Sequence, residues 1–156
     1  MRLRELRTTD RPALEALIRG TDAFTADEVD VALELIDAGA SHASGYRFIV
    51  AADEQDRAQG YACFGLTPLT DGTYDLYWIV VDAKLQRSGV GRALLDATRG
   101  AVRAANGRTI VIETSGKPSY ASQRYFYERC GCTLLVRYPD FYRVGDDKLV
   151  YLLKID

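Results

Sequence analysis

Gln86-Arg87-Ser88-Gly89-Val90-Gly91 is a glycine-rich junction that follows a strand-like run, residues 74–81, and leads into a helix-like run, residues 92–105. Glycines at such a junction let the backbone approach a ligand closely, and the first N–H groups of the helix have no partner inside it. The helix dipole adds positive potential at the same end. The junction therefore predicts a site for phosphate groups, and here a pyrophosphate.

Composition limits the class of protein. A chain of 156 residues suits one domain, residues 1–156, and its net charge of -2 argues against nucleic acid as the main partner. Residues 1–10 are charged and lack the apolar core of a signal peptide, and no run approaches the roughly 20 apolar residues that span a bilayer. We therefore expect a cytoplasmic protein that does not enter a membrane, with a homodimer as an open alternative.

The three cysteines, Cys63, Cys130 and Cys132, are an odd number in a chain without an export signal, which predicts reduced thiols. Cys130 and Cys132 could form half of a metal site. However, His42 is the single histidine, and no second Cys/His pair stands nearby to complete four ligands. We therefore predict no metal.

Helix signals dominate the first 40 residues after a short strand at residues 2–7. Asp10 is predicted as the N-cap of a helix with proline in its first turn. Thr25 and Glu28 have the spacing of a capping box for a second helix, and Gly39 is predicted to end it.

Strand signals begin at residue 46. Strands are predicted at residues 46–52, 61–67, 73–81, 108–115, 133–138 and 148–155, and helices at 92–105 and 119–130. The order βααβββαβαββ predicts a mixed α/β (α+β) fold with one sheet of about six to seven strands. Its first half is antiparallel, and the strand–helix–strand unit at residues 73–115 places a parallel pair at the glycine junction.

Two motifs in this order resemble signatures of the GNAT superfamily of N-acetyltransferases. Gln86-x-x-Gly89-x-Gly91 after Trp78-Ile79-Val80-Val81-Asp82 resembles its acyl-CoA-binding signature. Tyr125-Phe126-Tyr127-Glu128-Arg129-Cys130-Gly131-Cys132 resembles its later motif, a helix tyrosine followed by a glycine turn. The order of elements matches over nearly the whole chain, so the resemblance implies a GNAT-like fold.

The resemblance implies where acetyl-CoA, the co-substrate, would bind. N–H groups around Arg87 to Arg92 would hold the pyrophosphate of coenzyme A, and the strand Trp78–Val81 would pair with the pantetheine amides and polarise the thioester carbonyl. The alternative for the loop is a tight turn without a ligand, although helix starts prefer Ser, Thr, Asp or Asn. The predicted cofactor-binding residues are Ile79, Val80, Val81, Gln86, Arg87, Ser88, Gly89, Val90, Gly91, Arg92 and Tyr120.

Three residues are predicted to carry the chemistry. Tyr127 is the candidate general acid for the leaving thiolate, singled out from its aromatic neighbours by its spacing to Gly131. Asp75 and Glu113 compete as the base that removes a proton from the amine. Glu113 is favoured because a charge amid an apolar strand is hard to explain otherwise, although an ion pair with Arg124 would also explain it. For Asp75 the alternative is a solvated strand position.

The chain departs from the family pattern in two places. Many members carry an asparagine seven residues before the helix tyrosine, where this chain has Tyr120, so that contact is altered or lost. The loop at residues 114–119 is about two residues longer than in the ribosomal-protein alanine acetyltransferases. Residues 140–147 do resemble the penultimate loop of that branch, and either border the acceptor site or form only a hairpin connection.

The sequence therefore predicts an enzyme that moves an acetyl group from acetyl-CoA to a primary amine by direct attack. Its acceptor is a small-molecule or peptide amine. The alternative is a non-catalytic acyl-CoA-binding or sensor module on the same fold, which would need the glycine loop but neither Tyr127 nor a carboxylate. A nucleotide phosphotransferase is excluded, because the loop lacks the Gly-Lys-Ser/Thr of a P-loop.

Overall fold

A computed structural model describes residues 1–41 and 44–156. The strands are β1 (Arg2–Arg4), β2 (Arg47–Ala52), β3 (Ala58–Leu66), β4 (Thr73–Val81), β5 (Thr109–Ser115), β6 (Thr133–Arg143) and β7 (Asp146–Lys154). The α-helices are α1 (Arg11–Arg19), α2 (Ala26–Ala40), α3 (Val90–Ala104) and α4 (Ala121–Arg129). Single 3₁₀ turns lie at Thr8–Asp10, Ala83–Leu85 and Pro118–Tyr120.

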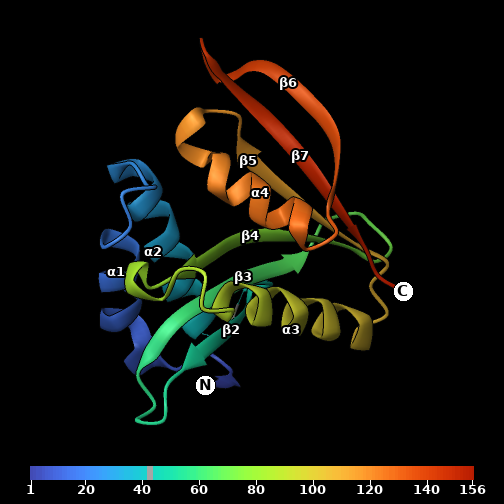
Figure 1. Cartoon of the computed structure of the whole chain (residues 1–156). Helices are drawn as coiled ribbons and strands as arrows, with labels where there is room; N and C mark the ends of the chain where they lie inside the picture. The colour runs from blue at the N-terminus through green and yellow to red at the C-terminus, as the bar shows by residue number, and fades with distance from the viewer. Residues whose placement is uncertain (42–43) are drawn as a thin grey trace.

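All seven strands form one sheet in the order β1-β2-β3-β4-β5-β7-β6 (Figure 1). β4 and β5 pair in parallel, and the other neighbours pair antiparallel. This arrangement confirms the predicted mixed fold, its antiparallel first half and its parallel pair.

Helices cover both faces of the sheet, and each face has its own hydrophobic core. One core joins α1 and α2 to the sheet through side chains such as Ile18, Ile36 and Tyr61. The other joins α3 and α4 through side chains such as Leu94 and Tyr127. Because successive strand residues point to opposite faces, β4 contributes to both cores.

The sheet splits between β4 and β5, and this split positions the site. The two strands are paired only from Thr73↔Thr109 to Leu76↔Ile112. Beyond that point β4 stays paired with β3 and β5 stays paired with β7. A bulge contributes to the divergence: Leu76 pairs with Phe64 and Trp78 with Cys63, which leaves Tyr77 as an extra residue on β4.

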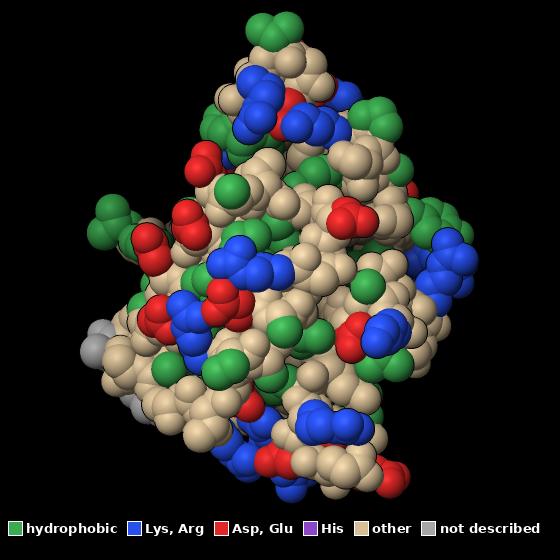
Figure 2. Space-filling model, turned by 90° about the vertical axis from the view of Figure 1, so that its left-hand side faces the viewer, with side chains coloured by type: hydrophobic (Ala, Val, Ile, Leu, Met, Phe, Trp, Pro, Cys, Tyr) green, Lys and Arg blue, Asp and Glu red, His purple; other side chains and the backbone are tan. Residues whose placement is uncertain are grey.

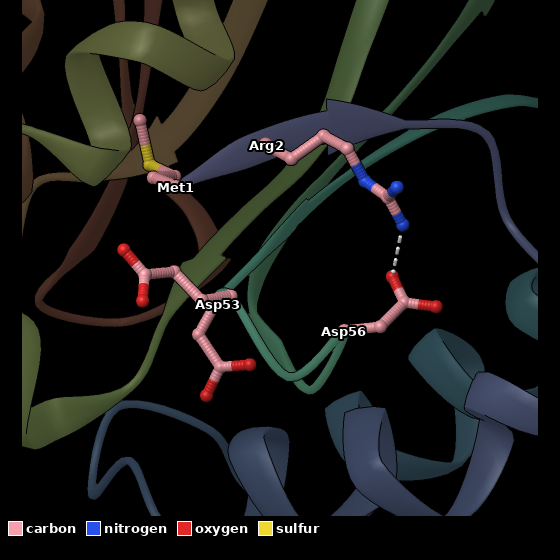
Figure 3. Close-up of a pocket in the computed structure, with 5 residues that line it drawn as sticks. Met1, Arg2, Asp53 and Asp56 are labelled. Carbon is pink, nitrogen blue, oxygen red and sulfur yellow. Dashed lines mark hydrogen bonds and ion pairs between the residues drawn. The ribbon is translucent and has the colours of Figure 1, made fainter.

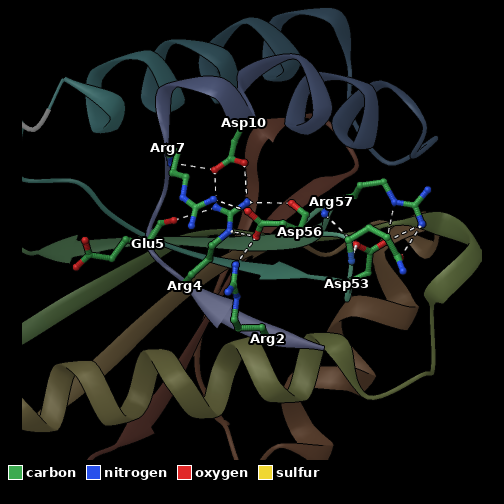
Figure 4. Close-up of polar contacts among 9 residues, drawn as sticks. Arg2, Arg4, Glu5, Arg7, Asp10, Asp53, Asp56 and Arg57 are labelled. Carbon is green, nitrogen blue, oxygen red and sulfur yellow. Dashed lines mark hydrogen bonds and ion pairs between the residues drawn. The ribbon is translucent and has the colours of Figure 1, made fainter.

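An arginine–carboxylate network fixes the N-terminal segment to the β2–β3 turn (Figure 4). The guanidinium of Arg4 donates to both carboxylate oxygens of Asp10, at 2.7 and 2.8 Å, and to Asp56 at 2.9 Å. Asp10 also accepts from the Arg7 N–H at 2.8 Å. Asp10 is the N-cap residue of α1, as predicted, but its side chain accepts from Arg4 and Arg7 and makes no capping bond to α1.

Other local predictions are corrected by tertiary packing. Thr25 and Glu28 form the predicted capping box, but α2 continues one residue past Gly39. Gly39 is required for close approach, because a Cβ there would lie 2.1 Å from the Phe48 ring. β3 begins at Ala58, three residues earlier than predicted.

The last two strands are longer than predicted and form an arm. β6 extends to Arg143 and β7 begins at Asp146, so most of residues 140–147 belongs to a strand. The arm rises away from the rest of the molecule in Figure 1, and at its tip in Figure 2 hydrophobic side chains lie next to Lys and Arg. Val144 at the hairpin turn is 92% exposed.

Candidate functional site

The glycine loop presents a group of free backbone donors at the start of α3. Gly89 is the N-cap residue, with φ +90°, and contributes no side-chain cap. In the described part of the chain, the N–H groups of Gly89, Val90, Gly91 and Arg92 have no acceptor. Arg87 also has positive φ, and such left-handed residues turn successive N–H groups toward a common anion. The loop can therefore bind a diphosphate.

The loop lies close to both β4 and α4. A Cβ on Gly91 would be 3.5 Å from the Phe126 ring and 3.7 Å from the Val81 side chain. The open edge of β4 thus leads from the split in the sheet to the free N–H groups of α3. An extended ligand could follow this edge with a phosphate at the far end.

A cleft of about 620 Å³ occupies the split between β4 and β5. It brings together Asp75, Ile79, Glu113, Tyr120 and Tyr127 from the predicted site. Residues 86–92 do not line it, and neither do Val80 and Val81. The side chain of Val80 is buried in the core beneath α1 and α2, so only its backbone could face a ligand.

Tyr127 is held in place by the end of α4. Its carbonyl accepts from the Cys132 N–H at 3.0 Å, and the Gly131 N–H bonds Glu128 O at 3.1 Å, with Gly131 at φ +86°. These bonds form a Schellman motif, which confirms the predicted role of Gly131 in ending the helix. The side chain is buried, and burial raises the pKa of Tyr127. The phenol therefore stays protonated and can act as a proton donor.

The two candidate bases are in different settings. Asp75 accepts from the Thr67 hydroxyl at 2.7 Å. Glu113 forms an ion pair with Lys148 on β7 at 2.9 Å, and its side chain is 51% exposed. The alternative of an ion pair for Glu113 is therefore confirmed, but its partner is Lys148 and not Arg124. Arg124 instead donates to the carbonyls of Ser115 and Lys117, which fixes the loop after β5.

Aromatic side chains form much of the cleft wall. Tyr77, Trp78, Tyr120 and Tyr142 line it, as does Phe24, which the sequence analysis missed. Phe24 lies between α1 and α2 and packs edge-on against Trp78, with ring centroids 4.9 Å apart. It carries no local motif, and only this long-range packing identifies it.

Tyr120 joins α4 to the segment before α2. Its hydroxyl donates to Ala23 O at 2.8 Å and lies 3.3 Å from a Glu28 oxygen. Tyr120, which stands where many family members carry asparagine, thus contacts the segment before α2 and the first turn of α2. The arm contributes Tyr142, Arg143 and Asp146, so residues 140–147 both form a hairpin and border the cleft.

Another pocket is a surface hollow of about 300 Å³ at the N-terminus (Figure 3). Asp56 there is held by Arg2 at 2.6 Å, so the hollow belongs to the arginine network.

Within residues 1–41 and 44–156, no group of His, Cys, Asp or Glu could hold a metal ion, and the three cysteines are free thiols. His42 lies outside the described residues. No described helix is long and apolar enough to cross a membrane.

Comparisons with known proteins agree with this geometry. The family profile described as an acetyltransferase (GNAT) domain matches residues 44–131. A Desulfovibrio desulfuricans structure assigned to the GNAT family is 44% identical with a TM-score of 0.94, and the match covers 99% of both chains. No curated protein sequence matches the chain.

Two more distant structures share the fold. The ribosomal-protein-S18-alanine N-acetyltransferase of Escherichia coli is 22% identical, with a TM-score of 0.78 over 99% of this chain and 94% of that one. A Salmonella typhimurium acetyltransferase solved with acetyl-CoA is also 22% identical, with a TM-score of 0.77 over 100% and 94%.

Proposed function

The chain belongs to the GNAT family of acetyltransferases, and from this we propose that it transfers an acetyl group from acetyl-CoA to a primary amine by direct attack. The observation that carries the proposal is the split between β4 and β5. It opens a cleft in which a buried phenol and two carboxylates meet beside the free edge of β4. One residue can donate a proton there, and two can accept one.

The residues at the end of this edge fit acetyl-CoA. The four free N–H groups at residues 89–92, with the exposed cations Arg87 and Arg92, match the two negative charges of a pyrophosphate. The free backbone of β4 at Trp78 and Ile79 can pair with amide groups and hold a carbonyl oxygen. When bound, acetyl-CoA supplies the acetyl group as a thioester.

Each side chain then has a definite task. Glu113 or Asp75 takes a proton from the ammonium, directly or through water, so that the nitrogen has a lone pair for attack. The N–H groups of β4 stabilise the negative charge that develops on the carbonyl oxygen. Tyr127 gives its proton to the departing sulfur, and the attacking nitrogen gives up its second proton, directly or through water, which restores the phenol. One C–N bond forms, one C–S bond breaks, and the products are an acetamide and coenzyme A.

The ion pair between Lys148 and Glu113 affects which carboxylate is the better base. Lys148 holds Glu113 and competes with an incoming ammonium for its charge, whereas Asp75 receives only a neutral hydroxyl. The two candidates are separated by Glu113→Gln and Asp75→Asn, which remove the charge but keep the shape. The variant that loses the alkaline rise in kcat/KM identifies the base.

The test is chromatographic detection of coenzyme A and an acetamide from acetyl-CoA and a panel of amines. We expect coenzyme A and acetamide in equal amounts. A product that forms through an acetylated protein, visible by mass spectrometry, would contradict direct attack. Binding of acetyl-CoA without any product would instead favour the sensor function.

A further inference from the structure

The cleft is strongly acidic for a protein of nearly balanced charge. Two cationic side chains, Lys117 and Arg143, line it, against five carboxylates, and Lys148 pairs with one of these from β7, which leaves an excess of two negative charges. The five carboxylates are Asp22, Glu28, Asp75, Glu113 and Asp146. In a cleft with protein walls such an excess concentrates a negative potential, which favours cationic ligands.

The cations are distributed unevenly over the carboxylates, because both cations of the lining belong to Asp146. Lys117 lies 3.3 Å from Asp146, and Arg143 lies 4.0 Å from it. Asp22, Glu28 and Asp75 have no cationic partner among the described residues. Three carboxylates therefore remain for a ligand.

Three carboxylates of the lining, Glu28, Glu113 and Asp146, act electrostatically on two tyrosines of the cleft, Tyr120 and Tyr142. Burial, followed by the charge of Glu28, raises the pKa of Tyr120 to about 12. Burial, followed by the charges of Glu113, Asp146 and Glu28, also raises the pKa of Tyr142. Carboxylates from α2, β5 and β7 thus line one cleft together with these aromatic rings.

A residue of the cleft lining also carries an unpaired acceptor. The Oε1 atom of Gln123, a residue of the cleft lining, is buried and accepts no hydrogen bond from the described residues. A buried acceptor without a donor costs free energy unless a ligand supplies one. Ammonium groups supply three donors and no acceptor.

A single positive charge does not explain this arrangement. The reactive nitrogen must lose its proton, and negative charges around it favour the ammonium form, which cannot attack. Asp75 and Glu113 on the split strands can remove that proton, but Glu28 on α2 has no such task. Its charge is useful if the ligand keeps a second cation after the first nitrogen is deprotonated.

We propose that the acceptor is a small aliphatic amine with a second cationic group, and that Glu28 binds this second group beside Tyr120 and Tyr142. The inference rests on the proposed acetyl transfer to a primary amine and assigns the class of amine that the enzyme acetylates. Glu28 is a specificity-determining residue here. Its carboxylate also caps α2, but two oxygens leave it free lone pairs for a cation.

The experiment compares amines that differ in one charge. The diamines 1,3-diaminopropane, 1,4-diaminobutane and 1,5-diaminopentane are tested against the corresponding amino alcohols, with coenzyme A measured by chromatography. We expect kcat/KM for the best diamine to exceed that of its amino alcohol by at least about tenfold, or ~1.4 kcal/mol. The preference should fall as salt is added, because salt screens charges.

Two variants make the test specific. Glu28→Gln should reduce the preference for the diamine by about tenfold, mainly through KM, while glutamine preserves the capping box of α2. Glu34→Gln, on an exposed position of the same helix, should leave the preference unchanged. Thermal unfolding checks that both variants remain folded.

The outcomes separate this inference from the proposed function. Equal use of diamines and amino alcohols, or a preference that survives Glu28→Gln, would overturn the second-cation site and leave amine acetylation intact. Failure of every amine to release coenzyme A would overturn both.

Discussion

Replacing Tyr127 with phenylalanine removes one oxygen atom from a side chain that is 8% exposed and lines the cleft. Within the described residues its hydroxyl has no hydrogen-bond partner, so the change leaves no protein group unsatisfied. The ring keeps its contacts with Phe126 and Tyr151, at centroid distances of 5.4 and 6.1 Å. We therefore expect the free energy of unfolding to change by less than about 0.5 kcal/mol.

The effect on catalysis should be much larger. Loss of a general acid lowers kcat by about 10²–10⁴-fold, which is ~2.7–5.4 kcal/mol in the activation barrier. The assay is coenzyme A release at saturating acetyl-CoA, with KM for acetyl-CoA expected to change little. Because burial raises the pKa of Tyr127, the wild-type rate should show no fall from this group below about pH 10.

A matched control lies two residues away on the same helix. Tyr125 is 59% exposed, and its hydroxyl accepts a bond from Arg129 at 3.0 Å, so Tyr125→Phe should leave kcat unchanged. If Tyr127→Phe turns over as fast as the wild type, another group or water protonates the sulfur and the reasoning fails. A large loss of stability in Tyr127→Phe would refute the structural part.

Two further predictions concern stability. Gly39→Ala should destabilise the protein by about 1–3 kcal/mol in urea unfolding, because the new Cβ meets the buried Phe48 ring. Gly100→Ala, in open space on α3, should be neutral or stabilising by up to about 1 kcal/mol. Equal effects of the two substitutions would show that α2 can shift to make room. Acid should weaken the arginine network: burial opposes ionisation of Asp10, but hydrogen bonds from Arg4 and Arg7 outweigh it and hold its pKa below the usual range. A lowered folded-state pKa gives stability that is present above the unfolded value of about 3.9 and is lost as pH falls through the folded one. Asp10→Asn should therefore flatten the fall in the free energy of unfolding below about pH 4, and an unchanged slope would exclude Asp10 as its source.

Local signals were sufficient for the elements that depend on local chemistry. Residues that are close in the chain predicted three of these features: the capping box at Thr25 and Glu28, the limits of β4 and the glycine end of α4. The errors came where a distant residue competes. Asp10 has the side chain of a helix cap but bonds Arg4, and Gly39 resembles a helix stop but packs against Phe48.

The sequence by itself predicted the proposed donor half of the site, because a backbone that can hold phosphate is made by consecutive residues at a strand–helix junction. Only the tertiary structure brought together the residues of the proposed acceptor half. Glu113 pairs with Lys148, and Glu28, Tyr120 and Tyr142 line one cleft, across more than 20 residues of chain in each case. Such contacts depend on how far the sheet splits and on where the arm and α2 then lie. No local pattern encodes those distances.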